Sequence, residues 1–233
     1  MSSSRLPGKV LMKNRDQSMV AIMVNRIRAA KGIHQIVIAT TTNPLDDEIE
    51  NEGKRLGVEV FRGSESNVLE RVVSAGRNYG AEGLVVLTGD CPLIDPRHIE
   101  TCTERYLRGE VDFVSNSHIR TYPDGMDVQV VSMSSMESAL KDSIDDLEKE
   151  HSTLHVRRNT PESRMVNILA PNEENFPHFG LTLDEPKDFA VINLILEHFY
   201  PRRDFSCREI IDFLNFNPQI LSINSGVVRK GDN

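Results

Sequence analysis

The chain has 233 residues, of which 39% are hydrophobic and 27% are charged, and its formal net charge at pH 7 is −8. This length and composition are ordinary for a globular protein with one α/β domain and an excursion, or with two small domains. The acidic balance argues against binding to nucleic acid, because no broad basic surface is expected to face the phosphates of a duplex. A local basic pocket for one small anion remains compatible with it.

Cysteine usage and the lack of recognisable targeting segments indicate a cytoplasmic protein. Cys91, Cys102 and Cys207 are widely spaced and form no CxxC pair, which fits a reducing compartment better than a disulfide framework or a zinc site. No apolar run approaches the ~18 residues needed to span a membrane. Residues 1–9 lack the apolar core of a secretory signal. We therefore expect a cytoplasmic location and no membrane partner.

Strand and helix alternate along the first half of the chain in units of ~25 residues, which is typical of βαβ units. Apolar residues at helical spacing predict a helix over 17–31, with Ser18 as its N-cap and Gly32 as its stop. The alternation predicts an α/β fold with a mainly parallel sheet covered by helices on both faces. Further strands are expected at 35–40, 58–61, 84–88 and 111–115, with helices at 45–56, 66–79 and 96–108.

The pattern changes after residue 118. A YPDG turn at 122–125 precedes an alternating run over 126–133 and an acidic, helical stretch over 134–158. We interpret 118–165 as an excursion from the sheet that forms a lid, a part of the substrate site or a subunit contact.

The core of the protein is expected to comprise residues 1–117 and 166–224. Strands at 165–170 and 181–184, a loop at 171–180, helices at 186–199 and 206–215, and a frayed tail over 225–233 complete the expected chain.

The run LVVLTGDCPLID at 84–95 is the first candidate for a functional site. An apolar strand stops at Thr88 and Gly89 and places Asp90 at its carboxyl end, which is where open α/β sheets bind ligands. A buried strand followed by an ordinary turn is the alternative.

Asp184 follows a second short apolar run, as Asp90 follows the first. Two carboxylates at adjacent strand ends suit Mg²⁺, which prefers oxygen ligands and completes its shell with substrate phosphates and water. The cation would neutralise a transferring phosphoryl group and the leaving pyrophosphate. Asp184 could instead cap the next helix, because Glu185 and Pro186 follow it.

The segment SSSRLPGK at 2–9 carries two cations, Arg5 and Lys9. A triphosphate needs fixed cations and backbone N–H groups that can approach closely, and small residues permit that approach. The segment is not a GxxxxGKS P-loop. A disordered basic N-terminus is the alternative interpretation.

Two further motifs leave their role open. His151 and His155 have the i,i+4 spacing of metal ligands on a helix, but no third histidine or cysteine supports zinc, and a solvated helical face is the alternative. The turn at 122–127 could recognise a hydroxylated ligand or form only a hairpin. Cys91 is interpreted as a small packing residue.

Together these stretches resemble the cytidylyltransferases that make CMP-activated eight- and nine-carbon acidic sugars, and within them the spore coat polysaccharide biosynthesis protein F group. The phosphate loop ARxxSxRLPxK of the family is similar to residues 2–9, and its strand-end motif is similar to LTGDCPL at 87–93. Its sugar-site element REHVT is similar to KEHST at 149–153, and its final acidic strand end is similar to LDEP at 183–186.

The resemblance implies a nucleotide-diphospho-sugar transferase fold, a Rossmann-like three-layer sandwich. It implies a Mg²⁺-dependent reaction in which CTP and a sugar acid give a CMP-sugar and pyrophosphate, a homodimer, and Arg5, Lys9 and Asp90 as catalytic residues. The implied sites are the CTP phosphates at Arg5 and Lys9 with Ser4 and Thr88 beside them, Mg²⁺ at Asp90 and Asp184, cytosine at Arg62, Gly63 and Ser64, and the sugar at Tyr122, Asp127, Glu150 and His151.

Two departures from the family pattern affect these expectations. The family begins with an apolar strand just before the phosphate loop, whereas this sequence starts at Met1 after that point. Because that strand is central, its two neighbours would lose a hydrogen-bonding partner, and we expect either a longer gene product or a degenerate paralogue. Lys149 and Ser152 replace the Arg and Val of REHVT, which affects the identity of the sugar more than the fold.

Two alternative functions remain open at this point. A metal-dependent glycosyltransferase of related fold would carry a DxD pair at a strand end, whereas Asp90 is followed by Cys91 and Pro92. A non-catalytic nucleotide-binding paralogue would be consistent with a missing first strand.

Overall fold

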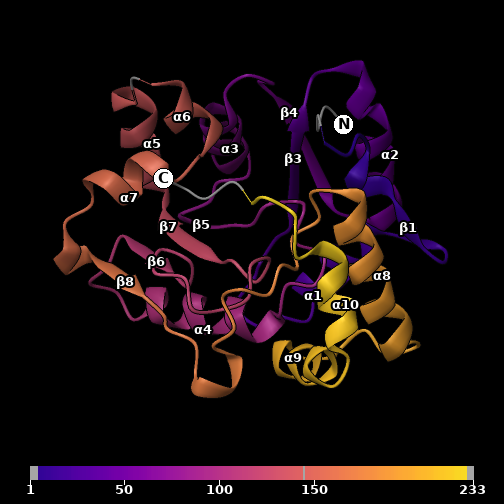
Figure 1. The fold of residues 1–233 in the computed structure, drawn as a ribbon. Coiled ribbons are helices and arrows are strands. Elements are labelled where there is room, and N and C mark those ends of the chain that lie inside the picture. The colour runs from indigo at the N-terminus through magenta and orange to yellow at the C-terminus, as the bar shows by residue number, and fades with distance from the viewer. Residues whose placement is uncertain (1–4, 144, 230–233) are drawn as a thin grey trace.

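A four-stranded sheet lies at the centre of the structure, a computed structural model that describes residues 5–143 and 145–229 (Figure 1). β7 pairs antiparallel with both β5 and β6, and β6 pairs parallel with β8, so β7 alone runs against the other three. The strand directions are therefore mainly parallel, as expected, while the pairing is mixed. The strands, in their order across the sheet, are β5 (Gly83–Val86), β7 (Gln129–Ser132), β6 (Phe113–Ser115) and β8 (Met165–Asn167).

A second, two-stranded sheet consists of β3 (Val37–Thr41) and β4 (Glu59–Gly63), which run parallel. β3 and β5 each lie at the edge of a sheet, and in the described part of the chain no strand pairs with both. The side chains of β5 from Leu84 to Val86 are only partly buried. This division of the sheet agrees with the expectation that two core strands lack a hydrogen-bonding partner.

Helices cover both faces of the four-stranded sheet and give the expected three layers. α1 (Met19–Ile27) and α4 (Pro96–Leu107) share a buried cluster with one face, and Figure 1 shows α4 below the sheet. α3 (Val68–Asn78), α5 (Met133–Asp142) and α7 (Leu154–Asn159) share a buried cluster with the other face.

The strand register explains how the sheet serves two cores. Phe113 of β6 pairs with Val131 of β7, and both belong to the cluster under α3 and α5. The next pair, Val114 and Val130, belongs to the cluster under α1 and α4. Successive side chains of a strand point to opposite faces, so both cores are filled from the same strands.

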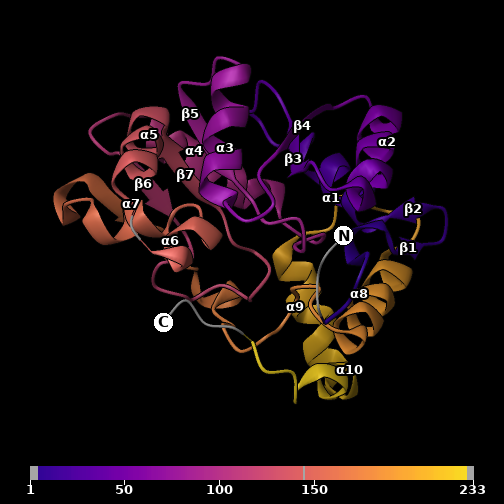
Figure 2. The same cartoon turned by 90° about the horizontal axis from the view of Figure 1, so that it is seen from above.

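Three C-terminal helices form a group beside the sheet in Figure 2: α8 (Pro186–Phe199), α9 (Cys207–Phe216) and α10 (Pro218–Asn224). They share a third buried cluster with Leu93, Leu181 and Leu183. The apolar residues beside Asp90 and Asp184 are thereby held against the same helices.

Helix ends follow capping residues that are readable in the sequence. The Ser18 hydroxyl accepts a hydrogen bond from the Ala21 amide at 3.1 Å and starts α1, as predicted. α2 (Asp47–Leu56) ends at Gly57, whose φ of 64° is the left-handed conformation that glycine adopts at little cost.

Two expectations about the second half of the chain are corrected, and a third is confirmed. β7 lies within residues 118–165 yet is an inner strand of the sheet, so this range is not wholly an excursion. The stretch 134–158 is helical, as predicted, and is divided into α5, α6 (Asp146–Glu150) and α7. Residues 181–184 form no strand, and the isolated β-bridge between Asp124 and Gly180 lies just before them.

The remaining elements are short. They are the hairpin of β1 (Lys13–Asn14) and β2 (Gln17–Ser18) and the 3-10 helices η1 (Lys9–Leu11), η2 (Pro44–Asp46), η3 (Glu162–Arg164) and η4 (Asn172–Glu174). Among residues 5–143 and 145–229, no helix has the length and apolar character that crossing a membrane requires.

Candidate active site

Asp90 and Asp184 are brought together by a backbone contact. The loop after β5 carries Asp90, and the segment entering α8 carries Asp184. The Leu183 amide donates a hydrogen bond to the Asp90 carbonyl at 2.8 Å, which joins the two segments directly beside both carboxylates. The predicted meeting of the two acidic residues is therefore found, although one segment is not a strand.

Lys9 lies between the two carboxylates. Its Nζ donates to Asp90 Oδ2 at 2.8 Å and to Asp184 Oδ1 at 3.0 Å. Burial opposes the charge of Lys9, but Asp90 and Asp184 outweigh it, so the pKa of Lys9 is raised above its ordinary value. Gly8 precedes Lys9 as the N-cap of η1. Its φ of 70° is the left-handed conformation that glycine adopts at little cost.

Arg5 completes the charged cluster. Its Nη2 lies 3.1 Å from Asp184 Oδ2. The N-cap of α8 is Glu185, so the Asp184 carboxylate binds cations rather than capping the helix. Two cations and two carboxylates from three distant segments thus meet at one point, whereas Ser4 lies outside the described residues.

The donor set fits a divalent cation. Lys9 shows that a positive charge is accommodated between Asp90 and Asp184, whose side chains are 22% and 14% exposed. Oxygen donors of this kind suit Mg²⁺, and the remaining exposure leaves room for substrate phosphates or water. The same point could therefore bind a metal ion, with Lys9 and Arg5 turned to phosphate.

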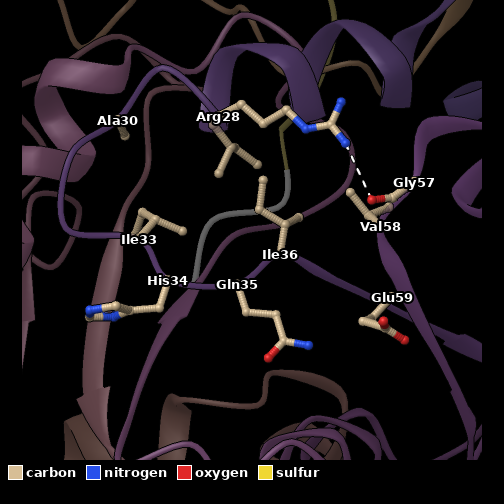
Figure 3. Close-up of a pocket in the computed structure, with 10 residues that line it drawn as sticks. Arg28, Ala30, Ile33, His34, Gln35, Ile36, Gly57, Val58 and Glu59 are labelled. Carbon is tan, nitrogen blue, oxygen red and sulfur yellow. Dashed lines mark hydrogen bonds between the residues drawn. The ribbon is translucent and has the colours of Figure 1, made fainter.

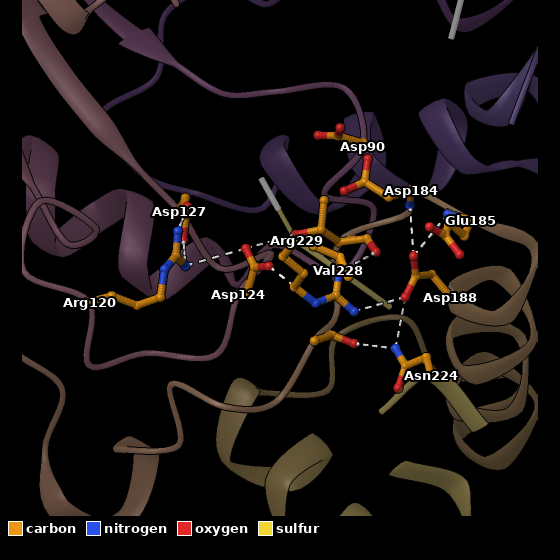
Figure 4. Close-up of polar contacts among 12 residues, drawn as sticks. Asp90, Arg120, Asp124, Asp127, Asp184, Glu185, Asp188, Asn224, Val228 and Arg229 are labelled. Carbon is orange, nitrogen blue, oxygen red and sulfur yellow. Dashed lines mark hydrogen bonds and ion pairs between the residues drawn. The ribbon is translucent and has the colours of Figure 1, made fainter. Parts of the chain in front are cut away.

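Asp127, expected at the sugar side, forms a two-fold ion pair with Arg120. The two Arg120–Asp127 hydrogen bonds measure 2.7 and 2.6 Å, and Arg120 also lies 3.4 Å from Asp124. Figure 4 shows Asp124 and Arg229 between this ion pair and the carboxylates of Asp184 and Asp188. The sugar-binding role that the resemblance implies for Asp127 stays a prediction.

Tyr122, expected at the sugar side, is buried. Its side chain is 6% exposed and packs in the core, with its ring centroid 4.4 Å from that of His98. Burial raises the pKa of the Tyr122 hydroxyl above its ordinary value. In the turn that follows, the Asp124 carboxylate accepts a hydrogen bond from the Thr182 hydroxyl at 3.0 Å and lies 3.4 Å from both Arg120 and Arg229.

The residues expected to border cytosine lie at the end of β4. Arg62 and Gly63 are its last two residues, and Ser64 follows it. Arg62 pairs with Asp47 and Glu50 of α2 at 2.5 and 2.9 Å rather than with the carboxylate cluster. The Ser64 hydroxyl accepts from the Asn67 amide at 3.1 Å, and a side chain at Gly63 would crowd its neighbours. Each residue thus has a structural role, and the cytosine assignment stays a prediction.

Glu150 and His151 lie at the end of α6, and Glu150 is exposed. His155 belongs to α7 and pairs with Glu148 at 2.8 Å, so it shares no continuous helix with His151. The two histidines therefore lack the helical geometry that their spacing suggested for a metal. The sugar-binding roles of Glu150 and His151 stay predictions.

Thr88 and Cys91 flank Asp90. The Thr88 hydroxyl lies 3.2 Å from the Cys91 sulfur. Burial and the neighbouring Asp90 raise the pKa of the Cys91 thiol well above its ordinary value, so it is a poor nucleophile. Its role as a small packing residue agrees with the sequence interpretation.

Sequence reasoning missed several polar residues beside the cluster. Asp188 could have been recognised from its position three residues after Glu185, which suits a capping box. Arg120 and Arg229 carried no such signal, and Arg229 fell in the tail expected to be frayed, whereas Asp124 belongs to the turn at 122–127 that the sequence had singled out. The structure places Arg229 against Asp188 at 2.8 Å.

Two other features lie apart from this cluster. A pocket of 350 Å³ is lined by residues including Arg28, His34 and Glu59, none of which was a candidate site residue (Figure 3). One atom each from His98, Glu174 and Cys207 lie within 4.8 Å of one another, an arrangement compatible with a metal ion. The 2.8 Å pair between His98 and Glu174 accounts for the proximity of two of them.

Comparisons with known proteins agree on one family. A family model described as cytidylyltransferase matches residues 1–198. The chain is 31% identical over 223 residues to the spore coat polysaccharide biosynthesis protein SpsF of Bacillus subtilis, covering 94% of this chain and 92% of that protein. It is 34% identical over 115 residues to an 8-amino-3,8-dideoxy-manno-octulosonate cytidylyltransferase of Shewanella amazonensis, covering 48% and 46% of the two chains.

A solved structure extends the likeness to the whole fold. A cytidylyltransferase from Leptospira borgpetersenii superposes with a TM-score of 0.89 at 30% identity, over 99% of this chain and 95% of that one. The expected three-layer nucleotidyltransferase architecture is confirmed.

Proposed function

Because the chain belongs to the cytidylyltransferase family, we propose that it transfers CMP from CTP to a sugar acid of the octulosonate or nonulosonate type and releases pyrophosphate. The chain is a nucleotidyltransferase that uses CTP. The acceptor class is supported by the motifs around Asp90 and Asp184 and by the likeness to an octulosonate cytidylyltransferase. The likeness to a spore coat polysaccharide protein supports a role in surface polysaccharide synthesis.

The contact of Lys9 with both Asp90 and Asp184 carries this proposal. Transfer of a nucleotidyl group involves little covalent chemistry for the protein, so positioning and charge neutralisation dominate. A site that concentrates cations and carboxylates at one point meets that need. Arg5, within 3.1 Å of Asp184, adds a second cation for the phosphates.

The residues take the following roles in the proposed reaction. Arg5 and Lys9 bind the phosphates of CTP and orient the α-phosphorus for in-line attack by a sugar hydroxyl. Asp90 and Asp184 would hold Mg²⁺, which when bound supplies charge neutralisation of the transferred group and pyrophosphate. Arg120 and Asp127 provide polar groups at the sugar side.

The direct test is pyrophosphate release. The protein is incubated with CTP and Mg²⁺ and a panel of sugar acids that includes octulosonic and sialic acids, with ATP, GTP and UTP as controls. We expect release with CTP and one sugar class. If none of the sugar acids in the panel supports pyrophosphate release, the proposed acceptor class is wrong.

A matched pair of variants tests the carboxylate site. Asp90→Asn should reduce turnover by roughly 100-fold, the scale of losing one preorganised electrostatic group. Asp204→Asn removes a carboxylate whose side chain is 80% exposed and should leave turnover unchanged. If Asp90→Asn turns over as fast as the wild type, the carboxylate assignment is wrong.

We propose that the enzyme is a homodimer, as the family resemblance implies. Light scattering measures the mass of the protein in solution and tests this.

A further inference from the structure

Asp188 is a buried carboxylate whose oxygens are fully used. Its side chain is not exposed to solvent. Oδ2 accepts hydrogen bonds from the amides of Asp184 at 3.1 Å and Glu185 at 2.9 Å. Oδ1 accepts from Asn224 Nδ2 and from Arg229 Nη2, both at 2.8 Å. A buried carboxylate is tolerated when such partners satisfy it, and Arg229 is the cation among these four.

One of these contacts reaches the proposed cation site. The capping box of α8 accounts for the bond from the Glu185 amide to Asp188. The Asp184 amide lies one residue before the N-cap and is bound in addition. Asp188 therefore fixes the backbone of the residue whose carboxylate faces Lys9.

Arg229 is held in a position that is shaped for it. Its Nη1 lies 3.4 Å from the Thr182 carbonyl, and its Nε lies 3.4 Å from Asp124 Oδ2. A Cβ at Gly180 would lie 1.9 Å from Arg229 Nη2, so only glycine leaves room for the guanidinium. Figure 4 shows Arg229 between Asp124 and Asp188.

The segment that carries Arg229 also touches the phosphate side of the site. Arg5 Nη1 donates to the Val228 carbonyl at 3.3 Å, while Arg5 Nη2 lies 3.1 Å from Asp184. The end of the described chain thus contacts Arg5 and, through Asp188, the backbone of Asp184.

We infer that Arg229 is a positioning residue for the carboxylate site, an inference that rests on the proposed function. By neutralising Asp188, Arg229 keeps that carboxylate on the amides of Asp184 and Glu185. The Asp184 side chain is then presented to the cation beside Asp90. The C-terminal segment must therefore be in place for the cation site to form.

The test compares full-length Arg229→Ala and Arg229→Lys with Arg208→Ala. Arg208 is a matched control because it pairs with Asp212 on the exposed surface of α9. Binding of Mn²⁺ alone is followed by electron paramagnetic resonance, and amide exchange of the peptide 181–189 is followed by mass spectrometry without metal. Thermal unfolding is recorded for all variants.

We expect Arg229→Ala to weaken Mn²⁺ binding about tenfold, the usual effect of removing a residue that orients a metal ligand. Exchange at the amides of Asp184 and Glu185 should become faster. Arg229→Lys should retain much of the affinity because it keeps the charge, and Arg208→Ala should bind as the wild type does.

Unchanged Mn²⁺ affinity in Arg229→Ala would overturn the inference, even with a lower melting temperature, because a role confined to anchoring the tail would lower stability alone. An equal loss of affinity in Arg208→Ala would overturn it as well. Pyrophosphate release by the wild type separates this failure from failure of the proposed function. If the wild type releases pyrophosphate and Arg229→Ala binds Mn²⁺ with unchanged affinity, the proposed function is supported and only the inferred role of Arg229 is wrong.

Discussion

The ammonium group of Lys9 lies 2.8 Å from the carboxylate of Asp90, and the two residues are 81 positions apart in the chain. The contact places the basic N-terminal segment on the loop after β5. Because Lys9 also lies 3.0 Å from Asp184, one ammonium group contacts two carboxylates, and Arg5 adds a second cation at Asp184.

Replacing Lys9 should affect stability in a pH-dependent way. Its pKa is raised above the ordinary 10.5, so its contribution is fully present below that pH and is lost as the pH rises through the folded-state pKa. We expect Lys9→Met to be less stable than the wild type between pH 7 and 9, because Asp90 and Asp184 then repel each other, and the difference to shrink in more alkaline solution. Urea denaturation from pH 7 to values above 10.5 measures it.

Lys54→Met is the matched control, since Lys54 makes an exposed ion pair with Glu50 on α2. Exposed pairs contribute about 0–1 kcal/mol, so little change is expected. If the difference in the free energy of unfolding between Lys9→Met and the wild type is as large above the folded-state pKa of Lys9 as at pH 7, the assigned ion pairs are wrong.

Asp95 should contribute strongly to the stability of the fold. Its carboxylate is 1% exposed, accepts from the Arg97 amide at 2.9 Å as the N-cap of α4, and accepts from the Cys207 amide at 2.6 Å. We expect Asp95→Ala to lower the free energy of unfolding by about 2 kcal/mol, combining a lost cap with an unpaired buried amide. Urea denaturation at pH 7 checks this, with exposed Asp204→Ala as the control.

The same residue predicts an acid dependence. Burial raises the pKa of Asp95, but hydrogen bonds from Arg97 and the Cys207 amide outweigh it and lower the pKa below 3.8. Its stabilising contribution is therefore present above pH 3.8 and lost as the pH falls through the folded-state value. A stability gap between wild type and Asp95→Ala that stays constant down to pH 2 would argue against these contacts.

The three cysteines should be unreactive in the folded protein. Cys91, Cys102 and Cys207 are buried, and burial raises the pKa of Cys102 to about 12. Ellman's reagent should modify them only on unfolding, when all three thiols of the chain react. Rapid modification of one thiol in native buffer would show that its surroundings open.

The divided sheet predicts a gain from an added strand. β3 and β5 both lie at sheet edges, and Leu84–Val86 of β5 are partly exposed. A chain extended before Met1 by an apolar strand should unfold at a higher urea concentration and show slower amide exchange in β3 and β5, because exposed edges gain partners. An extension of the same composition interrupted by proline is the control, and equal effects of both would refute the pairing.

Much of the fold could be predicted from sequence because its signals are local. Helix starts at Ser18 and Asp95, the stop at Gly57 and the alternation of strands and helices depend on residues close together in the chain. The position of β7 inside the sheet was not predictable in this way. Strand order depends on contacts between distant segments, and an alternating run looks the same in an excursion as in a sheet.

The sequence by itself determined an α/β architecture, because the alternation of strands and helices is a local pattern, and it singled out Arg5, Lys9, Asp90 and Asp184 as candidate site residues. The nucleotidyltransferase activity was expected from the resemblance of these motifs to a family, and the comparisons confirmed it. Only the tertiary structure decided which of these groups meet, that Tyr122 is buried, and that Arg229 reaches Asp188. The physical reason is that a buried charge selects its partner by proximity in the folded chain, whereas sequence separation says nothing of that distance.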